Sequence, residues 1–332
     1  MTPHQDFAIG EASQVGAARR SAARLGTERG YDDVVCGRIA LVVTELGNNL
    51  ARYATGGRLL IGADHGSDGV DVLALDAGPG MADVERCLTD GYSTSGTPGT
   101  GLGAVRRLCD EFSVFSQPGR GTVVFGRIAR SGAPSARKSN RFDVGAICLA
   151  APGETVSGDA WAFHGDGARG ALMVADGLGH GPQAAEAASA ALRVFDANHD
   201  LGPSQILELA HGALRSTRGA AVAMAALDAE AGRLLFAGAG NIAGRLISGV
   251  DDRSLLSQHG TIGLQIRRLQ DVVYPWGDHA LVVLHSDGLT TRWDLDDAGG
   301  LLACHPAVIA GWIIRDHLRG RDDATVVVVR RR

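Results

Sequence analysis

The chain has 332 residues, which is more than one hydrophobic core ordinarily holds, so two domains are predicted. Lysine is nearly absent, with Lys138 the only one, and this excludes P-loop and Schiff-base chemistry because each needs a lysine. The net charge of -5, with no dense basic run apart from the last three arginines, excludes nucleic acid as an expected partner.

The cysteines and the amino terminus indicate a cytoplasmic protein. The five cysteines are widely spaced and never form a C-x-x-C pair, so neither a disulfide framework nor a zinc site is predicted. The first residues lack the basic and apolar regions of a signal peptide, and no apolar run has the length that a bilayer requires. We therefore expect a soluble chain with no membrane association.

Residues 1–130 are predicted to form an α/β sandwich, because helical spacing of apolar residues gives way to strand-like alternation. The predicted elements, in chain order, are helices over 12–25 and 34–54, strands over 58–64 and 70–76, a helix over 102–110, and strands over 111–117 and 121–129. The last two strands are joined by a short turn and close the domain as a hairpin. The sheet is expected to be largely antiparallel.

Residues 131–141 are the expected linker, because they collect Ser, Pro, Gly and basic residues without apolar periodicity. Residues 142–332 then contain many short apolar strands. The helices predicted among them cover 182–198, 203–216 and 306–318. Many antiparallel strands with paired helices predict two packed sheets with helices outside them, so the fold class of the whole chain is α+β.

Two polar motifs in the first half contain candidate site residues. Glu45 and Asn49 are four residues apart and share one face of the second predicted helix, although such a pair is more commonly a solvated surface. Asp76 ends a predicted strand, with Gly78 and Gly80 in the turn that follows, where the backbone can pass close to a ligand.

A glycine-rich loop, STSGTPGTGLGAVRRL, opens the helix predicted near residue 102. Free backbone amides at a helix start bind anions. Taken alone, PGTGLGA matches phosphate-binding loops weakly, and a flexible surface loop is the alternative interpretation.

The order E-x-x-x-N, D-x-G-x-G, G-x-G-x-G resembles the GHKL family of ATP-binding domains, and nearly the whole first half is similar to its RsbT-type serine kinases. By that resemblance Asn49 would bind the Mg²⁺ that bridges the ATP phosphates, and Glu45 would be the base that orients the attacking hydroxyl. Asp76 would accept from the adenine amino group. The remaining residues implied for ATP are Gly78 and Gly80 beside the ring, Gly99, Gly101 and Gly103 around the phosphates, and Thr122 on the adenine side.

Aspartates recur at strand ends in the second half, at Asp159, Asp176, Asp287 and the pair Asp322–Asp323. One Asp-Gly at a strand end is a turn more often than a ligand. Four such points with only oxygen donors favour a hard divalent cation, Mg²⁺ or Mn²⁺. Paired metals on carboxylates can activate water and clamp a phosphoryl group, which suits hydrolysis of a phosphoester.

The motifs SGDAW, ADGLGHG, SDGL and RDDAT resemble the metal-dependent serine/threonine phosphatases of the SpoIIE and RsbX group, which implies an α-β-β-α sandwich. By resemblance Asp176 would bridge both metals with help from the Gly177 carbonyl, while Asp159 and Asp287 would complete the shell. Asp322 is the favoured ligand of the DDAT motif and Asp323 the weaker candidate, since the first carboxylate holds the family position.

Three further residue types are interpreted more plainly. His180 is assigned to a loop, and Asn241 is interpreted as a turn residue, with contact to the metal site as the less favoured alternative. No arginine matches the substrate-phosphate arginine that larger members of the superfamily place near their amino terminus. Specificity is therefore expected from protein docking.

Together the two resemblances imply a bifunctional partner-switching enzyme that phosphorylates and dephosphorylates a serine or threonine of a STAS-domain antagonist protein. A sigma factor or another downstream effector is a further implied partner. Two alternatives stay open. In one, only the phosphatase is active and the first domain senses ATP; in the other, the chain is a non-catalytic scaffold that binds its partner.

Overall fold

The computed structural model describes residues 2–63, 69–89, 101–130 and 141–332. By its internal contacts the chain divides into two compact units. One contains His4–Ser135 together with Ala298–Arg315; the other contains Ala136–Asp297 and Asp316–Arg332, with the first three residues. The sequence-based boundary at 142–332 therefore differs from this division, because Ala298–Arg315 groups with the first half of the chain.

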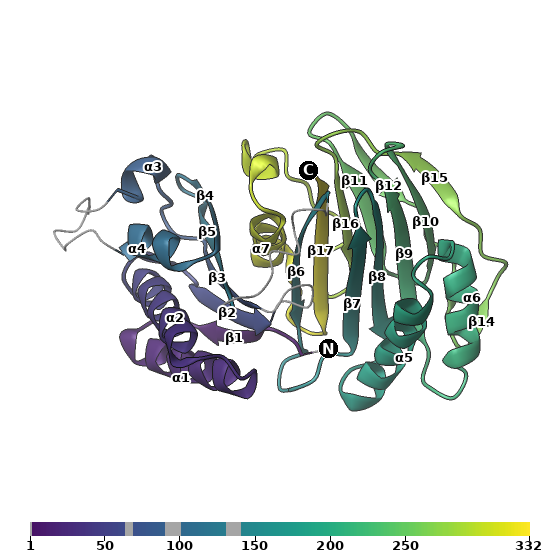
Figure 1. Cartoon of the computed structure of the whole chain (residues 1–332), viewed down its shortest axis with the longest axis horizontal. Helices are drawn as coiled ribbons and strands as arrows, with labels where there is room; N and C mark the ends of the chain where they lie inside the picture. Colours follow the sequence, from purple (N-terminus) through teal and green to yellow (C-terminus); the bar gives the residue numbers. More distant parts are fainter. Residues whose placement is uncertain (1, 64–68, 90–100, 131–140) are drawn as a thin grey trace. The chain divides into compact units, whose positions relative to one another are not determined.

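The first unit is built on one antiparallel sheet with strand order β1-β2-β3-β5-β4 (Figure 1). The elements of its first part are β1 (Gln5–Ala8), α1 (Ala12–Glu28), α2 (Asp33–Tyr53), β2 (Arg58–Ala63), β3 (Gly69–Asp76), α3 (Val84–Cys87), α4 (Gly101–Leu108), β4 (Glu111–Gln117) and β5 (Gly121–Ala129). The Asp32 side chain begins α2 by accepting a hydrogen bond of 2.8 Å from the Val35 amide.

One face of this sheet packs against α1 and α2. The alternation of β3 sends Val70, Val72 and Ala74 into the same core as Ile39 and Leu46 of α2. Among the described helices, α2 alone is long and apolar enough to cross a membrane. Its buried residues lie in this core, as expected of a central helix in a globular unit.

The opposite face of the sheet is covered by the segment Ala298–Arg315, which holds η2 (Leu301–Ala303) and most of α7 (Pro306–His317). Trp312 meets Phe115 edge to face at a centroid distance of 4.8 Å. A Cβ at Gly311 would lie 2.9 Å from Cγ1 of Val123. The odd-numbered apolar residues of β3 and their neighbours in β5 therefore have a cover of their own.

The second unit contains two five-stranded sheets, ordered β15-β10-β9-β8-β7 and β12-β11-β16-β17-β6, and a small β13-β14 pair. The strands are β6 (Phe142–Leu149), β7 (Asp159–Asp166), β8 (Arg169–Gly177), β9 (Ala220–Asp228), β10 (Arg233–Ala239), β11 (Ala243–Ile247), β12 (Asp252–Leu255), β13 (Gly260–Thr261), β14 (Gln265–Ile266), β15 (Val272–Pro275), β16 (Leu281–His285) and β17 (Ala324–Arg331).

Two cores hold this unit together. Side chains from both large sheets, including Leu172, Phe236 and Val327, form the core between them. The helices α5 (Pro182–Asn198) and α6 (Pro203–Ala213) form a second core with the outer face of the first of these sheets (Figure 1). The prediction of two sheets with helices outside them is confirmed for this pair of helices, and the fold is α+β as expected.

Candidate functional site

The first candidate site begins with Glu45 and Asn49 on α2. Gly101, the first residue of α4, faces both: a Cβ there would lie 3.2 Å from Glu45 Oε2 and 3.7 Å from Asn49 Oδ1. Gly103 is buried further along the same helix. The structure thus brings the carboxylate and the amide of α2 together with the start of α4, which lies more than fifty residues later in the sequence. Gly99 lies outside the described residues.

Asp76 stands at the end of β3, half-buried, and accepts a hydrogen bond of 2.7 Å from the Gly78 amide. Burial raises the pKa of Asp76, while the Gly78 hydrogen bond and the Arg315 charge oppose that rise. Thr122 is the direct cross-strand neighbour of Asp76 on β5. The predicted pair Asp76 and Thr122 is therefore one local feature.

Ser116 is a residue of this region that sequence reasoning missed. Its hydroxyl lies 2.8 Å from Thr122 Oγ1 and accepts a hydrogen bond of 2.7 Å from the Met81 amide. It thereby ties the turn after Asp76 to the hairpin of β4 and β5. Its register opposite Thr122 could have indicated it, because the hairpin turn is short.

The glycines after Asp76 are required by packing in the structure itself. A Cβ at Gly78 would lie 2.8 Å from Asp76 Oδ1 and 2.9 Å from the Tyr53 carbonyl. Gly80 has a φ of +68°, and a Cβ there would overlap the Gln117 carbonyl. A side chain at either position would displace the strand end that carries Asp76.

The second candidate site is the end of the two-sheet sandwich where the aspartates gather. Asp159 begins β7 and is the direct cross-strand partner of Asp176 on β8. Asp287 follows β16, which pairs with β17 in the other sheet. Ser286 links the sheets, since its hydroxyl donates to Asp159 Oδ2 at 2.6 Å. Carboxylates from two sheets therefore meet at one end of the unit.

The electrostatics of this cluster favour a bound cation. Burial, followed by the charges of the neighbouring carboxylates, raises the pKa of Asp176; burial also raises the pKa of Asp159. The Oδ1 atom of Asp159 is buried without a hydrogen-bond partner. Buried carboxylates in this state are costly unless a proton or a cation neutralises them.

The two members of the DDAT motif differ in their surroundings. Asp323 is 3% exposed, and its Oδ1 accepts a hydrogen bond of 2.8 Å from the Ala151 amide. Asp322 is exposed, and its side chain accepts a hydrogen bond of 2.9 Å from the Asp323 amide. Asp322 is therefore the freer carboxylate, whereas Asp323 fixes the turn at Ala151.

The donor chemistry fits Mg²⁺ or Mn²⁺. Within the described residues, no arginine or histidine forms an ion pair with any of these aspartates: Asp159, Asp176, Asp287, Asp322 and Asp323. No three acidic, histidine or cysteine side chains in those ranges form a ready-made metal shell. Mg²⁺ usually keeps several waters and uses few carboxylates directly, so an open cluster of oxygen donors suits it.

Asn241 lies in this site, which is the less favoured of the two interpretations that its sequence context allowed. Its Nδ2 donates to Asp287 Oδ2 at 2.7 Å, from the turn between β10 and β11. The signal that could have found it is its place directly after a strand end, the same context as the aspartates. His180 is an exposed loop residue whose Nδ1 lies 2.8 Å from Glu154 Oε1.

Gly177 is also required by packing, because a Cβ there would overlap the Ala184 carbonyl of α5. Its amide donates to the Gly158 carbonyl at 3.1 Å, next to Asp159. The loop after β8 is thereby held beside the start of β7.

Comparison with known protein families supports the resemblance predicted for each half of the chain. Residues 166–332 match the family described as Stage II sporulation protein E (SpoIIE). The chain belongs to the SpoIIE family. Residues 10–126 of this SpoIIE-family chain match the histidine kinase-like ATPase domain family.

The serine/threonine-protein kinase RsbT of Bacillus subtilis (strain 168) is 41% identical over 110 residues, which cover 32% of this chain and 83% of that protein. The first part of the chain therefore belongs to the RsbT family. The predicted fusion of an RsbT-like domain and a SpoIIE-like domain is confirmed.

Two solved structures each resemble the chain over 57% of its length. One, described as "The bacterial stressosome: a modular system that has been adapted to control secondary messenger signaling", is 30% identical with a TM-score of 0.53 and covers 57% of this chain and 99% of its own. The other, "Crystal structure of RsbX in complex with magnesium in space group P1", is 19% identical with a TM-score of 0.52 and covers 57% and 96%. The second likeness shows the fold alone.

Proposed function

We propose that this chain is a bifunctional partner-switching enzyme, with a kinase site at Glu45 and Asn49 and a phosphatase site at the aspartate cluster. Its substrate is one serine or threonine of a STAS-domain antagonist protein, which the two sites modify in opposite directions. The observation that carries the proposal is that one chain builds both arrangements: Glu45 and Asn49 against Gly101, and Asp159 paired with Asp176.

In the kinase direction, the partner hydroxyl attacks the γ-phosphorus of ATP, a new P–O bond forms, and ADP leaves. Glu45 orients that hydroxyl and takes its proton. Asn49 would hold Mg²⁺, which would supply charge neutralisation at the phosphates when bound. The Gly101 and Gly103 segment brings the start of α4 to the phosphates, where backbone amides favour negative charge.

In the phosphatase direction, water attacks the phosphorus, the bond to the partner oxygen breaks, and inorganic phosphate leaves. Asp159, Asp176, Asp287 and Asp322 would hold Mg²⁺ or Mn²⁺, with the Gly177 carbonyl assisting. When bound, the cations supply charge neutralisation and activation of water. Asn241 orients Asp287, and Ser286 orients Asp159, through the hydrogen bonds described above.

The experiment incubates the purified chain with ATP, Mg²⁺ or Mn²⁺ and the STAS protein encoded nearby, and follows the phosphopartner by mass spectrometry. Glu45→Ala is expected to abolish phosphorylation, and Asp176→Asn to leave the phosphopartner intact. Dephosphorylation without any labelling would favour an ATP-sensing first domain. A wild type that neither labels nor delabels its partner, yet binds it, would make the chain a scaffold.

A further inference from the structure

By sequence, the segment Ala298–Arg315 lies inside the SpoIIE match. By structure, it belongs to the first unit, which contains the RsbT-like sequence and is called the RsbT-like unit below. Every residue of α7 from Pro306 to Ile314 is buried. The amide of His305 donates to Ser113 Oγ at 3.2 Å, and its ring stacks on Phe125 at a centroid distance of 4.6 Å. The segment is therefore packed as a part of this unit.

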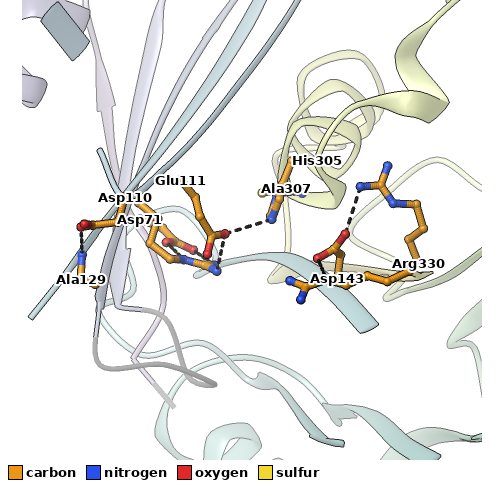
Figure 2. A network of polar contacts seen from close by, with 10 residues as sticks. Asp71, Asp110, Glu111, Ala129, Asp143, His305, Ala307 and Arg330 are labelled. Atoms are coloured by element: carbon orange, nitrogen blue, oxygen red, sulfur yellow. Dashed lines mark hydrogen bonds and ion pairs between the residues drawn. The ribbon is translucent and has the colours of Figure 1, made fainter. Parts of the chain in front are cut away.

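A polar row fixes the beginning of the segment. Asp71, Arg127 and Glu111 are cross-strand neighbours on β3, β5 and β4. Arg127 forms two hydrogen bonds of 2.5 and 2.7 Å with Asp71 and an ion pair of 3.4 Å with Glu111, and His305 Nε2 lies 3.4 Å from the same Glu111 oxygen (Figure 2). This row sets where α7 starts on the sheet.

Arg315 fixes the other end of the segment beside Asp76, the proposed adenine-binding residue. Its Nη1 donates to the Asp76 carbonyl at 3.0 Å. Its guanidinium carbon lies 3.5 Å from the centroid of the Trp312 ring, which is 2% exposed and cannot easily move. The side chain is thus held between a buried ring and the strand end that carries Asp76.

We propose that Arg315 is a positioning residue for adenine recognition, so that residues from the SpoIIE-like sequence complete the nucleotide pocket of the RsbT-like unit. This rests on the proposed function, in which Asp76 accepts from the adenine amino group. Arg315 holds the Asp76 backbone in place, and its positive charge favours the ionised carboxylate that can accept that hydrogen bond.

The test compares ADP with inosine diphosphate, which lacks the adenine amino group, by calorimetry on the full chain with Mg²⁺. Arg315→Ala is expected to weaken ADP binding about tenfold, because the hydrogen bond between the adenine amino group and the charged Asp76 carboxylate is lost. Binding of inosine diphosphate should stay nearly unchanged. Arg315→Lys, which keeps the charge, should restore part of the preference. Arg319→Ala removes an exposed arginine outside this unit and serves as the control.

If Arg315→Ala leaves the ratio of the two affinities unchanged, whether both fall equally or neither falls, the role is overturned and α7 is a structural cover only. Thermal unfolding of each variant shows whether the unit still folds. If the wild type binds neither nucleotide, the proposed nucleotide site itself is wrong. If the wild type prefers ADP and Arg315→Ala keeps the same preference, only the role of Arg315 is wrong.

A separate observation concerns Arg218, which lies just before β9 at the aspartate end of the second unit. The Gly219 carbonyl accepts from the Leu178 amide at 3.0 Å, and Ala221 is the cross-strand partner of Asp176. Arg218 Nη1 stands 3.1 Å from the position of a Cβ on Gly179, in the loop after Asp176. The topology therefore places this arginine beside the aspartate site.

Arg218 is exposed, and among the described residues it forms no hydrogen bond or ion pair. A cluster of carboxylates repels a phosphoryl dianion, so a phosphatase site gains from a cation nearby. The guanidinium fork of arginine matches phosphate oxygens in pairs. An unpaired arginine over the loop of a proposed metal ligand has the chemistry and the place for that task.

We infer that Arg218 binds the substrate phosphoryl group of the proposed phosphatase, a role for which the sequence showed no candidate. Arg218→Ala should raise KM for the phosphopartner about tenfold or more, with a smaller change in kcat, and Arg218→Lys should recover part of the loss. Arg215→Ala, which removes an exposed arginine of the same turn, should leave both unchanged. An unchanged KM in Arg218→Ala would overturn the role.

A binding measurement separates this role from the activity itself. In the Asp176→Asn background, where turnover is blocked, addition of Arg218→Ala should reduce phosphopartner affinity and abolish the difference between phosphorylated and unphosphorylated partner. Equal affinity with and without Arg218 would contradict the role. A wild type with no phosphatase activity that still shows this Arg218-dependent preference would overturn the proposed catalysis and leave Arg218 a phosphate-binding residue.

Discussion

The Ser286 hydroxyl donates to Asp159 Oδ2 at 2.6 Å and accepts from the Thr325 amide at 2.9 Å. One side chain therefore joins β7 of one sheet to β17 of the other. Both Ser286 and Asp159 are almost fully buried. Because Asp159 is a proposed metal ligand, this hydroxyl determines the direction in which the carboxylate points.

Ser286→Ala should destabilise the chain by about 1–3 kcal/mol, because it leaves a buried carboxylate oxygen and a buried amide unsatisfied. Urea unfolding followed by tryptophan fluorescence measures the change. Ser254→Ala, an exposed serine on β12, is the matched control and should fall within about 0.5 kcal/mol of wild type. Equal stability of the two variants would contradict the importance of this bond.

The raised pKa values of Asp159 and Asp176 predict how pH acts on the metal-free protein. The folded state holds protons on these groups more tightly than the unfolded state, so their contribution to stability is present at low pH and falls as pH rises through the folded pKa values. In EDTA, the Tm of the wild type should therefore decrease between pH 5.5 and pH 8.5. This decrease should be larger than the decrease in the Tm of Asp176→Asn over the same range.

Added Mn²⁺ should reverse that decrease, and its stabilisation should grow with pH because protons and metal compete for the same carboxylates. Thermal scans with EDTA and with Mn²⁺ at each pH give the difference directly. A Mn²⁺ effect that is constant over this range would show that these aspartates do not bind the ion.

Asn241→Ala should raise the Mn²⁺ concentration needed for half-maximal phosphatase activity about 10- to 100-fold, because Asp287 loses the amide that orients it. A metal titration at saturating phosphopartner measures this. Asn198→Ala, which removes an asparagine side chain that donates to the Val194 carbonyl of its own helix, is the control. A drop in activity that excess Mn²⁺ cannot recover would mean that Asn241 acts otherwise.

Gly311→Val tests the packing of α7 on the first sheet. The new side chain would meet Val123 and Leu75, and over-packing of this kind costs about 1–3 kcal/mol. Gly37→Val is the matched control, since Gly37 is also helical, lies in the same unit and has nothing near its Cβ position. Similar unfolding free energies for the two variants would mean that α7 does not rest on this face in solution.

Much of this organisation follows from local sequence patterns. The alternation in β3 and the helical spacing in α2 predict their elements, because a face that must be buried has to repeat at the period of its element. The strand-end positions of Asp76, Asp176 and Asp287 follow in the same way. The likeness of each half to a known family also depends on motifs that are short and continuous.

Tertiary structure alone decided which distant residues share a site. The alternation in β3 shows that Leu73 and Leu75 need a cover, but periodicity carries no information on which segment supplies it. The cover proved to be α7, from more than two hundred residues later, and with it came Arg315 beside Asp76. Asn241 and Arg218 lie near the aspartates for the same reason: strand order, rather than any local pattern, brings their turns to that end of the sheet.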